Sequence, residues 1–249
     1  MRSRWEPVQV GLFFAALVAA WEAGVRAFQV KEYLLPPPSA VALELWQSRW
    51  LLLQHGLITL NETVLGFLAG AVGGVLLAVG IFCSPLARRT VYPLVVALQS
   101  VPKAAVAPLL VVWFGFGLLS KVVMSFLIAF FPIVISALGG LMSTPENLLE
   151  HLRAHRATWW DTFWRLRVPS ALPSFVDGCK VAMPLAVIGA VIGEFVGSNE
   201  GLGNQIMLAS GTGRTPLVFA ALAAVTLLSL LLFAVVELLG GLVWWRSRA

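Results

Sequence analysis

The chain has 249 residues, of which 59% are hydrophobic and 12% are charged, and its mean hydropathy is +0.88. Soluble domains carry about 25% charged residues, so the composition excludes an ordinary soluble domain. Backbone polar groups in lipid must be satisfied within the chain, which favours helices. The sequence therefore predicts an all-α, polytopic membrane protein.

Six segments are long and apolar enough to cross a membrane, because a span needs roughly 20 such residues. We expect spans at about residues 9–28, 58–83, 91–113, 120–142, 176–198 and 216–245. The third is interrupted by Gln99, Ser100 and Lys103. No internal repeat and no low-complexity or disordered segment is evident, so we interpret residues 1–249 as a single transmembrane domain.

The distribution of basic residues predicts an orientation, since Lys and Arg accumulate on the cytoplasmic side of membrane proteins. With the N-terminus inside, ten basic residues are cytoplasmic: Arg2, Arg4, Arg88, Arg89, Arg153, Arg156, Arg165, Arg167, Arg246 and Arg248. Four are outside: Lys31, Arg49, Lys121 and Arg214. Both termini are therefore expected to be cytoplasmic. The net charge of +5 is interpreted as a topology signal and gives no indication of nucleic-acid binding.

Small residues recur at a spacing of four in two of the predicted spans. The second span holds Gly66, Gly70 and Gly74, and the fifth holds Gly189, Gly193 and Gly197. Each set forms a smooth strip along one helix face, where another helix can approach closely. The strips indicate either ordinary helix packing or a moving interface that lines a pathway.

Ionisable residues inside spans are costly and tend to face protein or water. Glu22 is one turn from Arg26 and can pair with it, whereas Glu237 is near an inner helix end and can reach water. Glu194 is deeper and adjoins Gly193, so it is a candidate pathway residue, with a hydrogen-bonded structural role as the alternative. Gln99, Ser100 and Lys103 form a second candidate pathway group, although Lys103 can also reach lipid phosphate.

A basic stretch between Leu148 and Pro173 separates the fourth and fifth predicted spans. Its larger apolar residues fall three, four or seven apart and are expected near one helical face: Leu149, Leu152, Trp159, Phe163 and Leu166. An amphipathic helix on the inner leaflet is one interpretation, but it does not explain Pro169 and Pro173. A segment that docks a soluble partner is the other.

Catalytic patterns are missing from the sequence. His151 and His155 are four apart, but Leu152 stands where a zinc protease has its glutamate. No phosphate-binding loop ending in Gly-Lys-Ser/Thr is present, so we expect neither ATP hydrolysis nor a cofactor or metal. Cys83 and Cys179 are expected to be packing residues.

Several motifs, in order, resemble the permeases of bacterial ABC importers of the nitrate, sulfonate and taurine type, a group that includes transporters of thiamine-precursor pyrimidines. The resemblance covers about residues 34–245. It rests on Leu35-Pro-Pro-Pro-Ser-Ala-Val41, Leu57-Ile-Thr-Leu60, Gly66-Phe67, Gln99-Ser-Val-Pro102, Ala107-Pro-Leu-Leu-Val-Val-Trp-Phe-Gly115, Phe130-Phe-Pro132, Glu194 and Gly201-Leu-Gly203.

The basic stretch resembles the family's coupling loop, which reads roughly Glu-Ala-Ala, three residues, Gly, and then Leu-Pro about a dozen residues later. The resemblance implies that the ATPase contacts Glu150, Arg153, Arg156, Ala157 and Thr158. His151-Leu152 replace the paired alanines, and Arg156 replaces the usual glycine. Arg156 then either adopts a positive φ at a small cost in strain or changes the turn.

The resemblance implies a type I ABC-importer permease fold of about six transmembrane helices, with a core at about 57–245 and a coupling loop at about 144–173. The implied location of the permease is the cell inner membrane, in contact with membrane lipid. The implied partners are a second copy of the permease, cytoplasmic ATPases, and a periplasmic or lipid-anchored binding protein. The implied substrate is a small polar or anionic solute such as nitrate, a sulfonate or taurine; the alternative is a thiamine-precursor pyrimidine. A secondary transporter and an integral-membrane enzyme are the alternatives from other classes.

Overall fold

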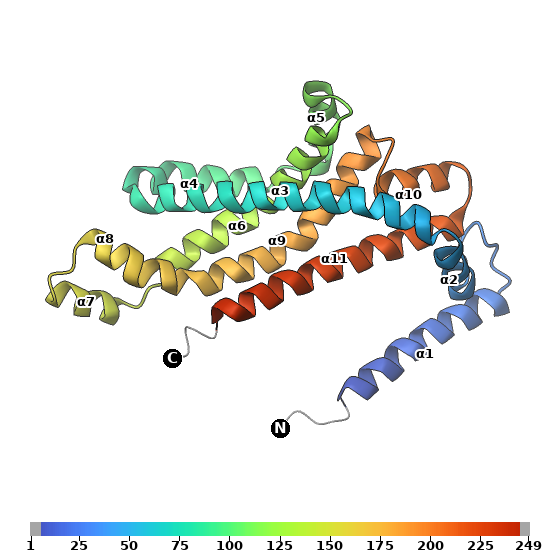
Figure 1. The fold of residues 1–249 in the computed structure, drawn as a ribbon, viewed down its shortest axis with the longest axis horizontal. Coiled ribbons are helices and arrows are strands. Elements are labelled where there is room, and N and C mark those ends of the chain that lie inside the picture. Colours follow the sequence, from blue (N-terminus) through green and yellow to red (C-terminus); the bar gives the residue numbers. More distant parts are fainter. Residues whose placement is uncertain (1–5, 245–249) are drawn as a thin grey trace.

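The computed structural model describes residues 6–244, and its elements are all helical (Figure 1). In chain order they are α1 Glu6–Ala27, α2 Pro38–Gln47, α3 Arg49–Cys83, α4 Pro85–Gln99, η1 Lys103–Val106, α5 Ala107–Phe114, α6 Leu118–Met142, α7 Glu146–Ala154, α8 Trp159–Thr162, η2 Phe163–Arg167, α9 Val168–Gly197, α10 Leu202–Gly211 and α11 Thr215–Trp244. Four arginines of the cytoplasmic count lie outside the described residues: Arg2, Arg4, Arg246 and Arg248.

Four helices of the described chain are long and apolar enough to cross a membrane. They are α3, α6, α11 and the continuous helical run Trp159–Gly197, which joins α8, η2 and α9. These helices contain the second, fourth, fifth and sixth predicted spans. The first predicted span corresponds to α1, which is outside this set.

The third predicted span is wrong as a single straight helix. α4 ends at Gln99, and the chain then turns by 86° into η1 and α5, so the pair counts as one broken span or a re-entrant segment. Pro102 explains the break, because proline lacks a donor N–H and disfavours helical geometry in the residue before it. The interrupting polar residues Gln99, Ser100 and Lys103 therefore mark a bend.

α6 lies between α3 and α9, and both glycine strips are positioned against neighbouring helices. A Cβ added to Gly74 would be 2.9 Å from Ile133 Cγ2, and one added to Gly189 would be 2.7 Å from Ser125 Cα. Gly66, Gly70 and Gly193 likewise lie against α6, whereas Gly197 lies against Val111 of α5. The glycines allow this approach because a Cβ would collide with the neighbour at Gly66, Gly74, Gly189 and Gly197, whereas at Gly70 it would make an ordinary contact.

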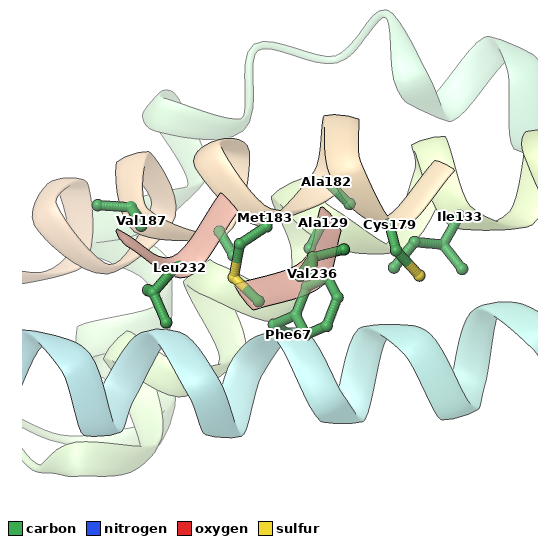
Figure 2. Packing of buried hydrophobic residues seen from close by; sticks show 10 residues of the cluster. Phe67, Ala129, Ile133, Cys179, Ala182, Met183, Val187, Leu232 and Val236 are labelled. Atoms are coloured by element: carbon green, nitrogen blue, oxygen red, sulfur yellow. The ribbon is translucent and has the colours of Figure 1, made fainter. Parts of the chain in front are cut away.

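The apolar core joins four helices (Figure 2). Phe67 of α3, Ile133 of α6, Met183 of α9 and Leu232 of α11 belong to one buried cluster. Cys179 is 7% exposed in the same cluster, as expected for a packing residue. The cluster thereby packs α3, α9 and α11 together with α6.

The two ends of the molecule differ (Figure 1). α7 and α8 lie at one end, beside the C-terminus of α6 and the N-terminus of α9, whereas α2 and α10 lie at the other. α1 diverges from the bundle, and its Trp21 ring lies 5.9 Å from the Phe219 ring of α11. The expected pair of Glu22 and Arg26 is confirmed, and Glu22 also accepts hydrogen bonds from the Ser39 backbone N–H and hydroxyl.

We predict that Gly189→Ala destabilises the folded protein by about 1–3 kcal/mol, because the new methyl group would collide with the α6 backbone. Gly80→Ala is the matched control, since a Cβ at Gly80 meets nothing within 4 Å. Thermal unfolding of the two purified variants in detergent measures the difference. Equal melting temperatures would contradict the close approach of α9 to α6.

Candidate functional site

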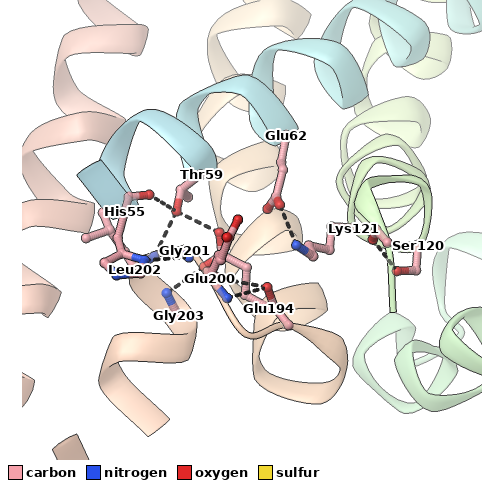
Figure 3. A network of polar contacts seen from close by, with 12 residues as sticks. His55, Thr59, Glu62, Ser120, Lys121, Glu194, Glu200, Gly201, Leu202 and Gly203 are labelled. Atoms are coloured by element: carbon pink, nitrogen blue, oxygen red, sulfur yellow. Dashed lines mark hydrogen bonds and ion pairs between the residues drawn. The ribbon is translucent and has the colours of Figure 1, made fainter. Parts of the chain in front are cut away.

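A buried polar cluster surrounds Glu194, which lies in the last turn of α9, nearer the helix end than we expected from the sequence (Figure 3). Glu194 is 1% exposed. Thr59 Oγ1 of α3 donates a hydrogen bond of 2.6 Å to Glu194 Oε1, and the Gly203 N–H donates one of 2.5 Å to Oε2. Both carboxyl oxygens are therefore held by donors from separate elements.

The Gly201-Leu-Gly203 motif is explained by its position around this carboxyl group. Gly201 has a φ of 97°, and a Cβ there would overlap the Glu194 carboxylate. A Cβ on Gly203 would be 2.7 Å from Glu194 Oε2 and 2.8 Å from the Val191 carbonyl oxygen. The chain can turn from α9 into α10 around Glu194 because these two positions lack side chains.

An ion pair adjoins Glu194. Lys121 Nζ of α6 is 2.8 Å from Glu62 Oε1 of α3, and the two residues are 6% and 0% exposed. Glu62 and Glu194 are also close enough to interact. Lys121, which the sequence analysis counted on the outer side, is thus a buried side chain of α6 whose charge is balanced inside the bundle.

Glu62 and Thr59 were not predicted from the sequence, although the position of Glu62 could have indicated its role. Glu62 is four residues before Gly66, so it continues the strip of Gly66, Gly70 and Gly74 on the face that packs against α6. An ionisable residue on a close-packing face cannot be solvated by lipid and needs a partner on the neighbouring helix.

His55 extends the cluster toward α10. The Gly201 N–H donates to His55 Nδ1 over 2.9 Å, and the Leu202 N–H donates to Thr59 Oγ1 over 2.9 Å. The Gln205 side-chain amide lies 3.0 Å from His55 Nε2. These contacts connect the start of α10 to α3. Lys121 and Glu194 connect α6 and α9 to the same cluster.

The other predicted pathway residues lie elsewhere. Gln99, Ser100 and Lys103 gather at the bend after α4, where Lys103 Nζ donates to the Gln99 carbonyl oxygen over 2.7 Å. The same ammonium group is 4.9 Å from the centroid of the Phe131 ring. Phe131 is ten residues beyond Lys121 on α6, or about 15 Å along the axis. The bend and the Glu194 cluster are therefore separate sites.

The residues predicted to contact an ATPase lie in the segment of α7 and α8. Glu150 is exposed on α7, and Arg153 pairs with Glu146 over 2.9 Å. Arg156 has a φ of 56°, so the strained of the two alternatives is the one present, and such a residue costs on the order of 1 kcal/mol. Leu149 and Phe163 are buried, but the expected single helical face is wrong because α7 ends at Ala154.

Thr158 begins α8 with a reciprocal cap. Its hydroxyl accepts from the Asp161 N–H over 3.2 Å, and Asp161 Oδ2 accepts from the Thr158 N–H over 3.3 Å. Such caps typically stabilise a helix start by about 1 kcal/mol. The cap and the Arg156 turn together fix the angle between α7 and α8, with Ala157 between them.

We predict that Lys121→Met destabilises the protein by about 3–5 kcal/mol, because it leaves the Glu62 charge buried without its partner. The double variant Glu62→Gln/Lys121→Met removes both charges and should recover most of the melting temperature. The comparison is made by thermal unfolding of detergent-purified protein. A double variant no more stable than Lys121→Met alone would show that charge pairing does not govern the effect.

Comparison with known proteins gives a consistent family. The chain is 38% identical to the formylaminopyrimidine transport permease protein ThiX of Halalkalibacterium halodurans, with 100% of both chains covered. It is 36% identical to the riboflavin transport system permease protein RibX of Chloroflexus aurantiacus, over 99% of this chain and 93% of the relative.

The fold is similar to that of a solved chain of the MetNI methionine ABC transporter in an inward facing conformation. The TM-score is 0.68 at 24% identity, with 79% of this chain and 98% of the solved chain covered. This is the type I importer permease fold. Residues 70–244 match the family described as binding-protein-dependent transport system inner membrane component. The chain belongs to that family: it is the membrane-spanning permease subunit of an ABC importer, in which ATP is hydrolysed by a separate subunit and substrate arrives through a binding protein.

Proposed function

We propose that this permease receives the ATPase on the α7–α8 segment and transmits its movement to the Glu194 cluster at the other end of α9. The supporting observation is the continuous helical run Trp159–Gly197, whose 39 residues begin in that segment and end beside Glu194. At 1.5 Å per residue this helix is about 58 Å long. A tilt at its first turn therefore displaces its last turn directly.

In this proposal, residues 1–249 form one transmembrane domain, with a core at about 57–245 and a coupling loop at about 144–173. The α7–α8 end is cytoplasmic, and both termini lie on that side. With Lys121 buried, the outer count retains Lys31, Arg49 and Arg214, which strengthens the asymmetry in basic residues. A cytoplasmic reporter fused to the C-terminus tests the orientation, and a periplasmic signal there would contradict it.

Two copies of the permease form the pathway. α5 projects from the bundle and carries exposed apolar side chains that need lipid or protein contact (Figure 1): Val112 is 78% exposed and Trp113 is 66% exposed. Each copy receives one ATPase, and a periplasmic or lipid-anchored binding protein delivers substrate at the α2–α10 end. Closure of the ATPases then tilts the spans and opens the pathway outward.

The substrate is a small polar solute, and a pyrimidine-type nitrogen heterocycle is the first candidate. The relatives at 38% and 36% identity are named for a formylaminopyrimidine and for riboflavin, and both compounds are nitrogen heterocycles. Lys121, the buried cation among the described residues, is already paired with Glu62 and so is not itself free to bind an anion. A sulfonate such as taurine remains the second candidate, from the resemblance of the sequence motifs.

The substrate proposal is tested with the assembled importer. Cells that express the permease with its ATPase and binding protein are given labelled formylaminopyrimidine or labelled taurine. Uptake of the pyrimidine that depends on all three components supports the proposal. Taurine uptake with no pyrimidine uptake would assign the importer to the sulfonate class instead.

We predict that Glu150→Ala weakens recruitment of the ATPase about tenfold, because a charge-assisted hydrogen bond contributes about 1.5–3 kcal/mol. Glu237→Ala removes an equally exposed carboxylate from α11 and is the matched control. Co-purification of the ATPase from detergent-solubilised membranes measures the effect. If both variants retain the ATPase equally, Glu150 has no coupling role.

We predict that Glu194→Gln preserves assembly with the ATPase but lowers substrate uptake severalfold. The amide keeps the size of the carboxyl group, but its –NH₂ cannot accept the hydrogen bond now donated by Thr59 or by Gly203. Complex recovery and uptake are measured on the same membranes. Normal uptake would leave Glu194 with a purely structural role.

A further inference from the structure

A cavity of about 600 Å³ lies between the α3–α4 connection and the α7–α8 segment. Its lining comes from the ends of three spans: Cys83 at the end of α3, Met142 at the end of α6 and Arg167 just before α9. Spans end where the hydrocarbon core gives way to lipid headgroups. The cavity therefore lies at the α7–α8 end of the bundle, at or beyond the edge of the hydrocarbon core.

Positive charge dominates the cavity lining. Arg88, Arg153 and Arg167 line it together with one carboxylate, that of Glu146. Glu146 is paired with Arg153 over 2.9 Å. Among the described residues, Arg88 and Arg167 have no carboxylate partner within salt-bridge distance.

The two remaining guanidinium groups are held in place with donors to spare. Arg88 donates from one nitrogen to the Phe82 carbonyl oxygen over 3.3 Å, and Arg167 donates from one nitrogen to the Leu141 carbonyl oxygen over 3.0 Å. Both groups also lie over the Phe82 ring, at 5.8 Å and 4.9 Å from its centroid. Each guanidinium has five N–H donors, so most of them can bind a ligand.

A buried hydroxyl group points to a missing acceptor or donor at the same place. Thr144 lines the cavity and is 8% exposed, and its Oγ1 has no hydrogen-bond partner among the described residues. Buried polar groups are normally hydrogen-bonded, and leaving one without a partner is costly. Oγ1 itself has almost no accessible surface in this structure, so a ligand oxygen in the cavity would satisfy it only once the side chain turns the hydroxyl toward the cavity.

We infer that this cavity binds the phosphate group of an anionic ligand through Arg88, Arg167 and Thr144. Guanidinium groups match phosphate geometry and can donate two parallel hydrogen bonds to it. Trp159, Leu149 and Met142 give the cavity apolar walls for the part of the ligand that adjoins the phosphate. The ligand is either an anionic lipid headgroup or a free phosphate ester, and both present the same group.

The test uses the full chain purified in neutral detergent, so it depends on neither the orientation nor the substrate proposed above. Binding of phosphatidylglycerol is measured by native mass spectrometry, with phosphatidylcholine, whose phosphate charge is balanced by its choline cation, as the zwitterionic reference. Binding of inorganic phosphate is measured by titration calorimetry. Arg88→Gln should weaken binding about tenfold, since it removes a charge-assisted hydrogen bond.

Arg89→Gln is the matched control, because Arg89 is the adjacent residue on α4 and is not part of the cavity lining. Thr144→Val removes the hydroxyl group at constant shape and decides the matter if Arg88→Gln fails to fold. Phosphatidylglycerol binding that falls in Arg88→Gln and Thr144→Val but not in Arg89→Gln supports a lipid site. The same pattern with phosphate alone supports a free phosphate ester. No binding of either probe, or equal losses in Arg88→Gln and Arg89→Gln, would overturn the inference.

Discussion

The close approach of α6 to α3 and α9 is the constraint on which the rest of the structure depends. Lipid tails are as apolar as leucine side chains, so helices in a membrane associate through packing and polar contacts. Ser125 of α6 lies against Gly66 on one side and Gly189 on the other, and its hydroxyl donates to the Ala186 carbonyl oxygen over 3.0 Å. The register set at Ser125 brings Lys121, one turn earlier, opposite Glu62.

The polar cluster follows from that register and closes one end of the bundle. Thr59, Glu62, Lys121 and Glu194 come from three spans, and each forms a hydrogen bond or ion pair with another element. Charged and hydroxyl groups at this depth are stable only when they satisfy one another. The backbone of Gly201 to Gly203 completes the cluster, so the connection between α9 and α10 is held by the same contacts that hold the spans.

Local sequence patterns predicted much of this fold. The features that they did not predict depend on contacts between residues far apart in the sequence. Glycines four apart predicted the packing faces, and the glycine that the resembling family has at position 156 left a positive φ at Arg156 as one of two alternatives. The pairing of Glu62 with Lys121 joins positions 59 residues apart, and no local period reveals it. Residues 91–113 were predicted to be one span because hydropathy is averaged over a stretch of sequence. Such an average does not reveal that the chain changes direction at Pro102. The break after Ala154 was missed because apolar spacing continues through it.

The π turn Phe163–Arg167 interrupts the α geometry of the long helix near its start. A π turn contains one residue more than an α turn, and such turns often occur at functional sites. Its relaxation to α geometry rotates everything beyond it by about 100° and shifts it by about 1.5 Å along the axis. The far end of that helix is clamped by Thr59 and Gly203 through Glu194. A change of register at the π turn would therefore have to be absorbed within α9, or it would break the hydrogen bonds that hold Glu194.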